Sequence, residues 1–361
     1  MVKKILKTLI TLIIIVAVLV IAYFAYALLN YNRIEDYQSL DVNGEAAKSS
    51  LTTEENYRIV SSNLGFGAYS DDFSFFMDGG TESWAYSKEA VNQNINGSLD
   101  AILSLNPDII VCQEIDIDST RSYHIDEREI IYDRLDKSSF GNWCSTFAQN
   151  YDSPFLILPF KQPHGIARAG LMAISSAQIN EATRRSLPIE EGITKLIDLD
   201  RCYSKNVIDV DNGKQLILYN VHLSAYTTDP STAENQVKLL NEDMRGEFAA
   251  GNYIVVGGDM NKDVLGDSTK YFNTSAKDQL WAVAFPEDLL ESDFSVVKPV
   301  DEENPIASCR NADGPYNEDS FVITVDGFIV SSNIEVVDAS VLDTGFKYSD
   351  HNPVYMDFIL K

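Results

Sequence analysis

Short apolar runs with polar side chains at one end dominate the sequence after residue 56. They cover residues 57–63, 108–114, 216–222, 253–261, 321–326 and 354–360, with a further short run at 327–331. Their length and composition are typical of buried core strands. Because strand ends converge on one rim of a sheet, we expect these polar side chains to share one cleft. They are Asn63, Glu114, His222, Asp259, Asn261 and Asp326, with Asp350 and His351 just before the last run.

Taken singly, each polar cluster has an ordinary structural explanation. Asp350 could cap a turn beside a surface His351, Glu114 could be a plain strand-end acid, and Asn261 could belong to an Asx-turn. Taken together, the clusters favour a functional site. The chain has only four histidines, and two of them, His222 and His351, stand at such positions.

The order of these clusters resembles the endonuclease/exonuclease/phosphatase superfamily, which includes pancreatic deoxyribonuclease, abasic-site endonucleases, neutral sphingomyelinases and inositol polyphosphate phosphatases. The shared motifs, in family order, are Asn63, Gln113-Glu114, His222, Gly258-Asp259-Met260-Asn261, Asp326 and Ser349-Asp350-His351. The resemblance covers about residues 57–360. It implies an α/β (α+β) fold, a four-layer sandwich of two mainly antiparallel β-sheets flanked by helices.

The resemblance also implies roles in metal-assisted hydrolysis of a phosphoester. Glu114 is the first candidate ligand for Mg²⁺, with Mn²⁺ as a substitute, and Asp350 is the second. Asn63 would touch the metal shell or the phosphate through its amide. His351 would act on the attacking water or on the phosphate, with Asp326 bonded to its other ring nitrogen to fix the tautomer.

The remaining residues complete the implied mechanism. Asp259 would orient water for in-line attack, and Asn261 and His222 would donate to non-bridging phosphate oxygens. His222 is also a candidate to protonate the leaving group. The division of work between the two histidines therefore stays open.

The N-terminal segment predicts attachment to a membrane. Residues 8–29 carry no charge, and at 1.5 Å per residue they are long enough to cross a hydrocarbon core of about 30 Å. Lys3, Lys4 and Lys7 precede them, so the N-terminus should be cytoplasmic and the large domain outside. The alternative is a signal peptide cleaved after Ala27, which would give a secreted form, although the apolar run is long for one.

We predict three parts: an anchor at 1–30, a polar stalk or linker at 31–56, and one catalytic domain at 57–361. Candidate helices cover residues 87–105 and 233–250. None of the four cysteines forms a CxxC pair, which makes a zinc site unlikely. Cys112 should be a buried thiol, and one disulfide among the other three stays open.

The charge of the chain bears on its substrate. With 28 basic and 54 acidic residues the net charge is −26, and removing the three lysines of the first 30 residues leaves −29 for the rest (−26 − 3). Such a domain should repel nucleic acid unless basic residues gather locally. The acidity also has a simple explanation in solubility.

Two further groups of residues are candidates for substrate contact. An aromatic segment with Phe66, Tyr69, Phe73, Phe75, Phe76, Trp84 and Tyr86 follows Asn63. It could line the cleft, dip into a bilayer, or fold over the edge of the core. The candidate phosphate contacts are Arg121, His124, Lys161, His164 and Arg168.

Three functions are compatible with these observations. The favoured one is a membrane-anchored, Mg²⁺-dependent phosphoesterase that acts on a small phosphorylated compound or a phospholipid headgroup. The others are an extracytoplasmic nuclease and a non-catalytic binding module. The complete polar set argues against the binding module, and no sequence feature requires a protein partner.

Overall fold

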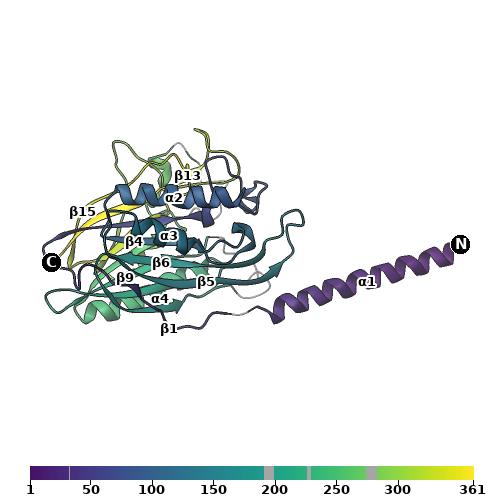
Figure 1. Cartoon of the computed structure of the whole chain (residues 1–361), viewed down its shortest axis with the longest axis horizontal. Coiled ribbons are helices and arrows are strands. Elements are labelled where there is room, and N and C mark those ends of the chain that lie inside the picture. Colours follow the sequence, from purple (N-terminus) through teal and green to yellow (C-terminus); the bar gives the residue numbers. More distant parts are fainter. Residues whose placement is uncertain (32, 191–198, 226–228, 273, 275–282) are drawn as a thin grey trace.

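Two seven-stranded sheets form the centre of the molecule (Figure 1). The computed structural model describes every residue except 32, 191–198, 226–228, 273 and 275–282. The first sheet has the order β1 (Gln38–Ser39), β7 (Ile179–Ser186), β8 (Cys202–Asp209), β9 (Gln215–His222), β10 (Tyr253–Asp259), β14 (Asp326–Ser331), β11 (Phe294–Val297). The second has the order β15 (Ile334–Val341), β16 (Val354–Leu360), β3 (Asn56–Asn63), β4 (Ile109–Asp116), β6 (Gly165–Ser175), β5 (Cys144–Leu156), β2 (Asn43–Gly44).

Most neighbouring strands are antiparallel, as predicted. Within the described residues each sheet has one parallel pair, β9 with β10 and β3 with β4. A separate ribbon pairs β12 (Cys309–Arg310) with β13 (Val322–Ile323). The run at 321–326 is therefore not one strand, so the prediction of a single strand that ends on Asp326 is wrong, whereas the family motif of an Asp that opens a strand is confirmed at Asp326. Asp326 instead opens β14, because the backbone N–H groups of Val325 and Asp326 both donate to the Ser308 hydroxyl.

Helices cover the outer faces of both sheets, which gives the predicted four layers. Helices α2 (Lys88–Ser104) and α3 (Glu127–Asp136) pack on the second sheet, and α4 (Pro230–Ala249) packs on the first. The Ser87 hydroxyl caps α2 by accepting from the N–H of Ala90. The two helices expected at 87–105 and 233–250 are confirmed, whereas α3 was not predicted.

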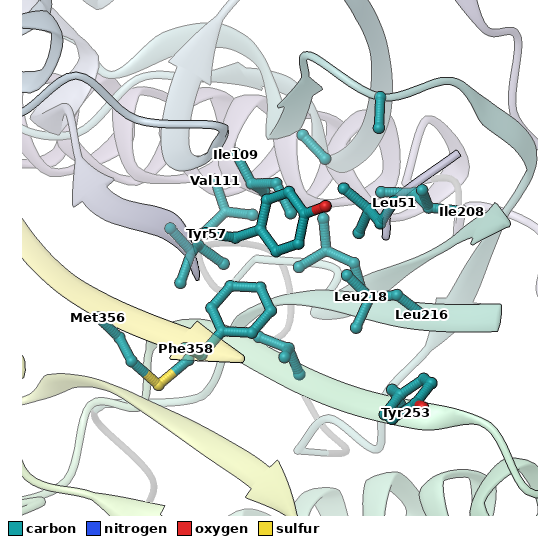
Figure 2. Packing of buried hydrophobic residues seen from close by; sticks show 14 of the residues in the cluster. Leu51, Tyr57, Ile109, Val111, Ile208, Leu216, Leu218, Tyr253, Met356 and Phe358 are labelled. Atoms are coloured by element: carbon teal, nitrogen blue, oxygen red, sulfur yellow. The ribbon is translucent and has the colours of Figure 1, made fainter. Parts of the chain in front are cut away.

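The main core lies between the sheets and follows from alternation along the strands. Ile59 in β3 and Leu218 in β9 point into this core, while Val60 and Tyr219 point outward to the helices. Figure 2 shows the packing of the inner residues, among them Tyr57, Ile109, Val111, Leu216, Leu218 and Phe358. The two sheets therefore hold their strand ends in fixed relative positions.

Residues ahead of the predicted catalytic domain also join the sheets. β1 pairs with β7, β2 pairs with β5, and Leu51 is fully buried in the core between the sheets. The boundary at residue 57 stays a prediction, but the segment from 38 to 51 packs along the domain.

Two other features bear on the sequence predictions. All four cysteines are free and buried, so the structure contains no disulfide. Helix α1 (Val2–Leu29) is long and apolar enough to cross a membrane, with a mean hydropathy of 3.0 over an 18-residue window. Figure 1 shows it extending away from the sheets.

Candidate active site

The ends of four central strands bring the predicted residues together. Asn63, His222 and Asp259 are the last residues of β3, β9 and β10. His222 is the register partner of Asp259. On the other side of Asp259, the antiparallel β14 places its first residue, Asp326, directly opposite. The sheet register thus brings distant parts of the chain to one rim.

Glu114 reaches the same rim through an irregularity in β4. The pairing of β4 with β6 shifts between Cys112 and Ile115, and Glu114 has a φ of 54°. A positive φ is uncommon for glutamate, and such bulges redirect side chains next to functional sites. The Glu114 carboxylate accepts from Asn63 Nδ2 at 3.1 Å and lies 3.8 Å from His222 Nε2.

Asp326 and His351 form a hydrogen-bonded pair. His351 Nδ1 lies 2.7 Å from Asp326 Oδ2, and the Ser308 hydroxyl donates to the same carboxylate oxygen at 2.7 Å. Burial lowers the pKa of His351, but the Asp326 carboxylate and the Cys309 thiol more than offset this, so the net pKa is well above its usual value. Its Nε2 lies 3.8 Å from Asp259 Oδ2.

Asp259 stands between the two histidines. Its Oδ2 accepts from Asn63 Nδ2 at 3.0 Å and lies 3.5 Å from His222 Nε2. Burial raises its pKa to about 6, which leaves it mostly ionised at neutral pH. Its Oδ1 accepts from the backbone N–H of Asn261 at 2.8 Å. This turn gives Asn261 a φ of 49° and places it in the lining of the cavity.

His222 has no carboxylate partner comparable to Asp326. Burial, reinforced by the charges of Arg201 and His351, holds its pKa well below the usual range. Its Nδ1 is buried without a hydrogen-bond partner among the described residues. His222 is therefore neutral at pH 7, whereas His351 favours the protonated form.

The acidic residues fit a hard divalent cation. Burial and the charge of Glu114 raise the pKa of Asp350 to about 7, against an opposing effect of His351. A cation beside these carboxylates would favour their ionised form, and Mg²⁺ prefers such oxygen ligands. The Nδ2 of Asn63 donates to Glu114 and Asp259, and its Oδ1 accepts from the N–H of Gly65, so the predicted contact of Asn63 with the metal shell or the phosphate stays a prediction. Asn63 orients carboxylates here.

A second group of potential ligand atoms lies nearby. Atoms of Asp259, Asp326 and His351 all lie within 4.8 Å of one another. His351 Nδ1 is already bonded to Asp326, and imidazole is a poorer ligand for Mg²⁺ than oxygen. The carboxylates of Glu114 and Asp350 would therefore suit Mg²⁺ better than this group.

One cavity of about 160 Å³ is lined by Glu114, His222, Asp259, Asn261, Asp350 and His351, whereas Asn63 and Asp326 are hydrogen-bonded to lining residues and are not part of the lining. Water occupies about 30 Å³ per molecule in the liquid, so the space suits a phosphate group with a few waters. Three buried arginines also line it, namely Arg121, Arg201 and Arg310. The acidic chain thus has the local concentration of basic groups that binding of an anion requires.

Two of the five candidate phosphate contacts line this cavity. Arg121 pairs with Asp116 at 2.9 Å, and His164 Nε2 lies 2.9 Å from the Tyr151 hydroxyl. Burial lowers the pKa of His164 to about 3. The other three, His124, Lys161 and Arg168, are exposed and lie outside the described cavity lining.

Two cationic residues in the lining were not predicted. Arg201 directly precedes β8, the antiparallel neighbour of β9, and therefore starts beside the end that carries His222. Arg310 lies in β12, and its position depends on long-range packing. Its guanidinium donates to the carbonyl groups of Ser70, Phe73, Asn311 and Gly314. Arg201 could have been predicted from its position as a basic residue just before an apolar strand. No local sequence feature predicts that Arg310 lines the cavity.

The aromatic segment combines two of the predicted roles. Phe66 and Phe73 are fully buried in the core under α2. Tyr69 and Phe75 line the cavity beside Met77. The segment therefore folds over the core edge and also forms one wall of the cleft.

Solved structures with the same fold support this architecture. An endonuclease/exonuclease/phosphatase from Beutenbergia cavernae matches with a TM-score of 0.54 at 14% identity, covering 85% of this chain and 72% of that one. The human Nocturnin catalytic domain, solved with a bound sulfate, gives 0.52 at 16% identity and covers 89% and 97%. ANGEL2, a 2′,3′-cyclic phosphatase, gives 0.52 at 12% identity and covers 91% and 99%.

No family model matches the sequence, and no curated protein does. At such low identities the structural matches establish the fold. The chain therefore has the endonuclease/exonuclease/phosphatase fold, as its motifs predicted.

Proposed function

We propose that the protein is a membrane-anchored, Mg²⁺-dependent phosphoesterase. The observation that carries this proposal is one cavity lined by His351, Asp259 and the carboxylates of Glu114 and Asp350, with Asp326 hydrogen-bonded to His351. The buried arginines in the same lining supply charge complementary to a phosphate. Enzymes of this fold, such as ANGEL2, supply precedent for phosphoester chemistry.

Each residue of the site has a separate role in the proposed reaction. A bound Mg²⁺ would polarise a phosphate oxygen. Asp259, with a pKa of about 6, is ionised at neutral pH and accepts the proton of the attacking water. As the new bond from water to phosphorus forms, the bond to the leaving oxygen breaks. Protonated His351 donates from Nε2 to the phosphate, where negative charge builds up.

His222 and Asn261 would contact the non-bridging oxygens of the phosphate. Neutral His222 lies 3.5 Å from Asp259 through Nε2. Its ring N–H is suited to donate to a phosphate oxygen, while its low pKa makes it a poor resting acid for the leaving group. Asn261 Nδ2 donates to the carbonyl of Leu223 at 2.9 Å, and we propose that it turns to the phosphate when substrate binds.

The apolar helix supports anchoring, and Lys3, Lys4 and Lys7 before it favour a catalytic domain on the outer face. Alkaline carbonate extraction and protease treatment of intact cells test the topology. Release of the protein by carbonate, or a mature N-terminus at Leu28, would contradict an uncleaved anchor.

Substrate screening tests the catalytic proposal. We expect hydrolysis of phospholipid headgroups or small phosphorylated compounds with Mg²⁺ or Mn²⁺, and loss of activity after EDTA dialysis. Plasmid DNA is the comparison, because the net charge of −26 disfavours a polyanion. Faster cleavage of DNA would establish the nuclease alternative, and full activity after EDTA would refute the metal assignment.

A further inference from the structure

The connection between β5 and β6 carries a group of exposed apolar side chains. Phe155, Ile157, Leu158 and Phe160 are 41%, 39%, 59% and 77% exposed. We refer to residues 154–163 as the hairpin tip. It contains one lysine, Lys161, and no acidic residue, although the chain as a whole carries −26. Gathered apolar side chains on a soluble surface mark a place of contact with another molecule or a membrane.

The hairpin tip is attached to the end of α1. The N–H of Ile157 donates to the Tyr23 hydroxyl at 2.9 Å, and the N–H of Phe155 donates to the Tyr26 hydroxyl at 3.3 Å. In Figure 1, α1 leaves the domain on the side where β5 and β6 extend. The exposed apolar surface of the tip therefore continues that of the helix.

This attachment fixes the depth of the hairpin tip relative to a membrane. Tyr23 lies six residues before Leu29, the last residue of α1, which corresponds to about 9 Å along a helix. If residues 8–29 cross the hydrocarbon layer, Tyr23 and Tyr26 lie near its outer boundary, where tyrosine is enriched in membrane proteins. The backbone of the tip, bonded to both, must lie at the same boundary.

The same segment is connected to the cavity. Gln162 Nε2 donates to Glu82 at 2.8 Å, and the Trp84 indole donates to the Pro163 carbonyl at 2.6 Å. His164, which directly follows the tip, lines the cavity. Met77, 46% exposed, lies on the aromatic segment in the same lining. The side of the cavity formed by these residues is therefore tied to the tip.

We propose that the hairpin tip enters the interface of the bilayer that holds α1, and so sets the cavity beside phospholipid headgroups, which are the substrate class. The choice of substrate rests on the phosphoesterase function proposed above, whereas the membrane contact rests only on the membrane-spanning α1 proposed there. Lys161 extends from the tip to the headgroup layer, as lysine does at membrane interfaces.

A fluorescence experiment tests the membrane contact. Full-length protein is reconstituted into vesicles of phosphatidylcholine and phosphatidylglycerol, with an environment-sensitive dye on Phe160→Cys. The control is Val337→Cys, a residue 52% exposed on β15, at the opposite edge of the second sheet. The native cysteines are all buried, so labelling is selective. We expect lipids brominated on their acyl chains to quench the dye at 160 and not at 337.

Two results would overturn the membrane contact. One is equal, unquenched emission at both positions. The other is burial of the dye at 160 that depends on the ratio of protein to lipid and not on bromination, which would show that a second copy of the chain covers the tip.

Turnover separates this inference from the phosphoesterase proposal. Leu158→Ser/Phe160→Ser should hydrolyse vesicle phospholipid at least about tenfold more slowly, since burying one large apolar side chain contributes about that factor or more. Hydrolysis of soluble bis(p-nitrophenyl) phosphate should be unchanged, and Val337→Ser should change neither. Equal loss on both substrates would overturn the inference. Failure of wild-type protein on both would refute the enzyme proposal, while the labelling result would still decide the membrane contact.

Discussion

His351 and His222 lie on two sides of one cavity and differ in their protonation. Both are buried, at 7% and 2% exposed. Burial lowers the pKa of each, yet the net pKa of His351 rises and that of His222 falls. The difference is Asp326, bonded to His351 at 2.7 Å, for which His222 has no equivalent. The comparison shows that a carboxylate partner, more than exposure, decides which imidazole carries the proton.

Removing the charged histidine should have the largest effect. We expect His351→Ala to lower kcat by about 10⁴-fold, because the charged donor to the phosphate is lost and the pKa of Asp259, which the charge of His351 lowers, rises. His124→Ala, at an exposed histidine outside the described cavity lining, is the matched control and should change kcat little. Steady-state kinetics on the substrate found by screening measures both. A loss below tenfold would remove His351 from the reaction.

Replacing Asp326, the hydrogen-bond partner of His351, with a neutral residue should have the second-largest effect on kcat. Asp326→Asn should keep the fold and lower kcat by about 10³-fold, because an amide stabilises neither the imidazolium nor the required tautomer. The double variant with His351→Ala should be little worse than His351→Ala alone, since members of one catalytic unit are not additive. Multiplicative losses in the double variant would show that the two residues act independently.

The neutral histidine should tolerate replacement better. His222→Gln retains an N–H donor, and we expect a loss of about tenfold to 10²-fold in kcat. Its effect should be the same throughout the pH range around neutrality, because His222 does not titrate there. A variant that removed a titration from the pH profile of kcat would contradict a neutral His222.

The smallest expected effect is the contribution of His164 to the stability of the protein. Like His222 and unlike His351, this histidine has no hydrogen-bonded carboxylate partner among the described residues. Its pKa is lowered from 6.5 to about 3 in the folded protein, so between these values the unfolded chain binds more protons. The stabilisation is present above pH 6.5 and is lost as the pH falls toward 3. His164→Gln should flatten this part of the stability profile, measured by urea unfolding. An identical pH slope in the variant would contradict the lowered pKa.

The strand ends were predictable because their signals are local. Asn63, His222 and Asp259 each close an apolar run, and the runs became β3, β9 and β10. The bond between Asp326 and His351 was expected from the resemblance, and it depends on register and on Ser308, which no local pattern marks.

Other parts of the site depend on contacts that the sequence does not display. Arg310 reaches the cavity through backbone carbonyls distant in the chain. Helix α3 buries few side chains, mainly Ile131 and Leu135, so its apolar periodicity is weak. The sequence of the hairpin tip is that of an ordinary apolar strand, and only the structure shows that its side chains are exposed.

The pairing of β1 and β2 with the sheets limits how far the catalytic domain can stand from a membrane. Eight residues separate Leu29 from Gln38, a span of at most about 29 Å when extended. Arg33 donates to the Leu187 carbonyl at 2.7 Å, and the Ile34 N–H donates to Asp200, which shortens this reach. With α1 in a bilayer, the cavity would therefore be held at a nearly constant height. Such an enzyme would meet its substrates by diffusion in the plane of the membrane. It would act only on phosphate groups that lie at the height of the cavity above the lipid surface.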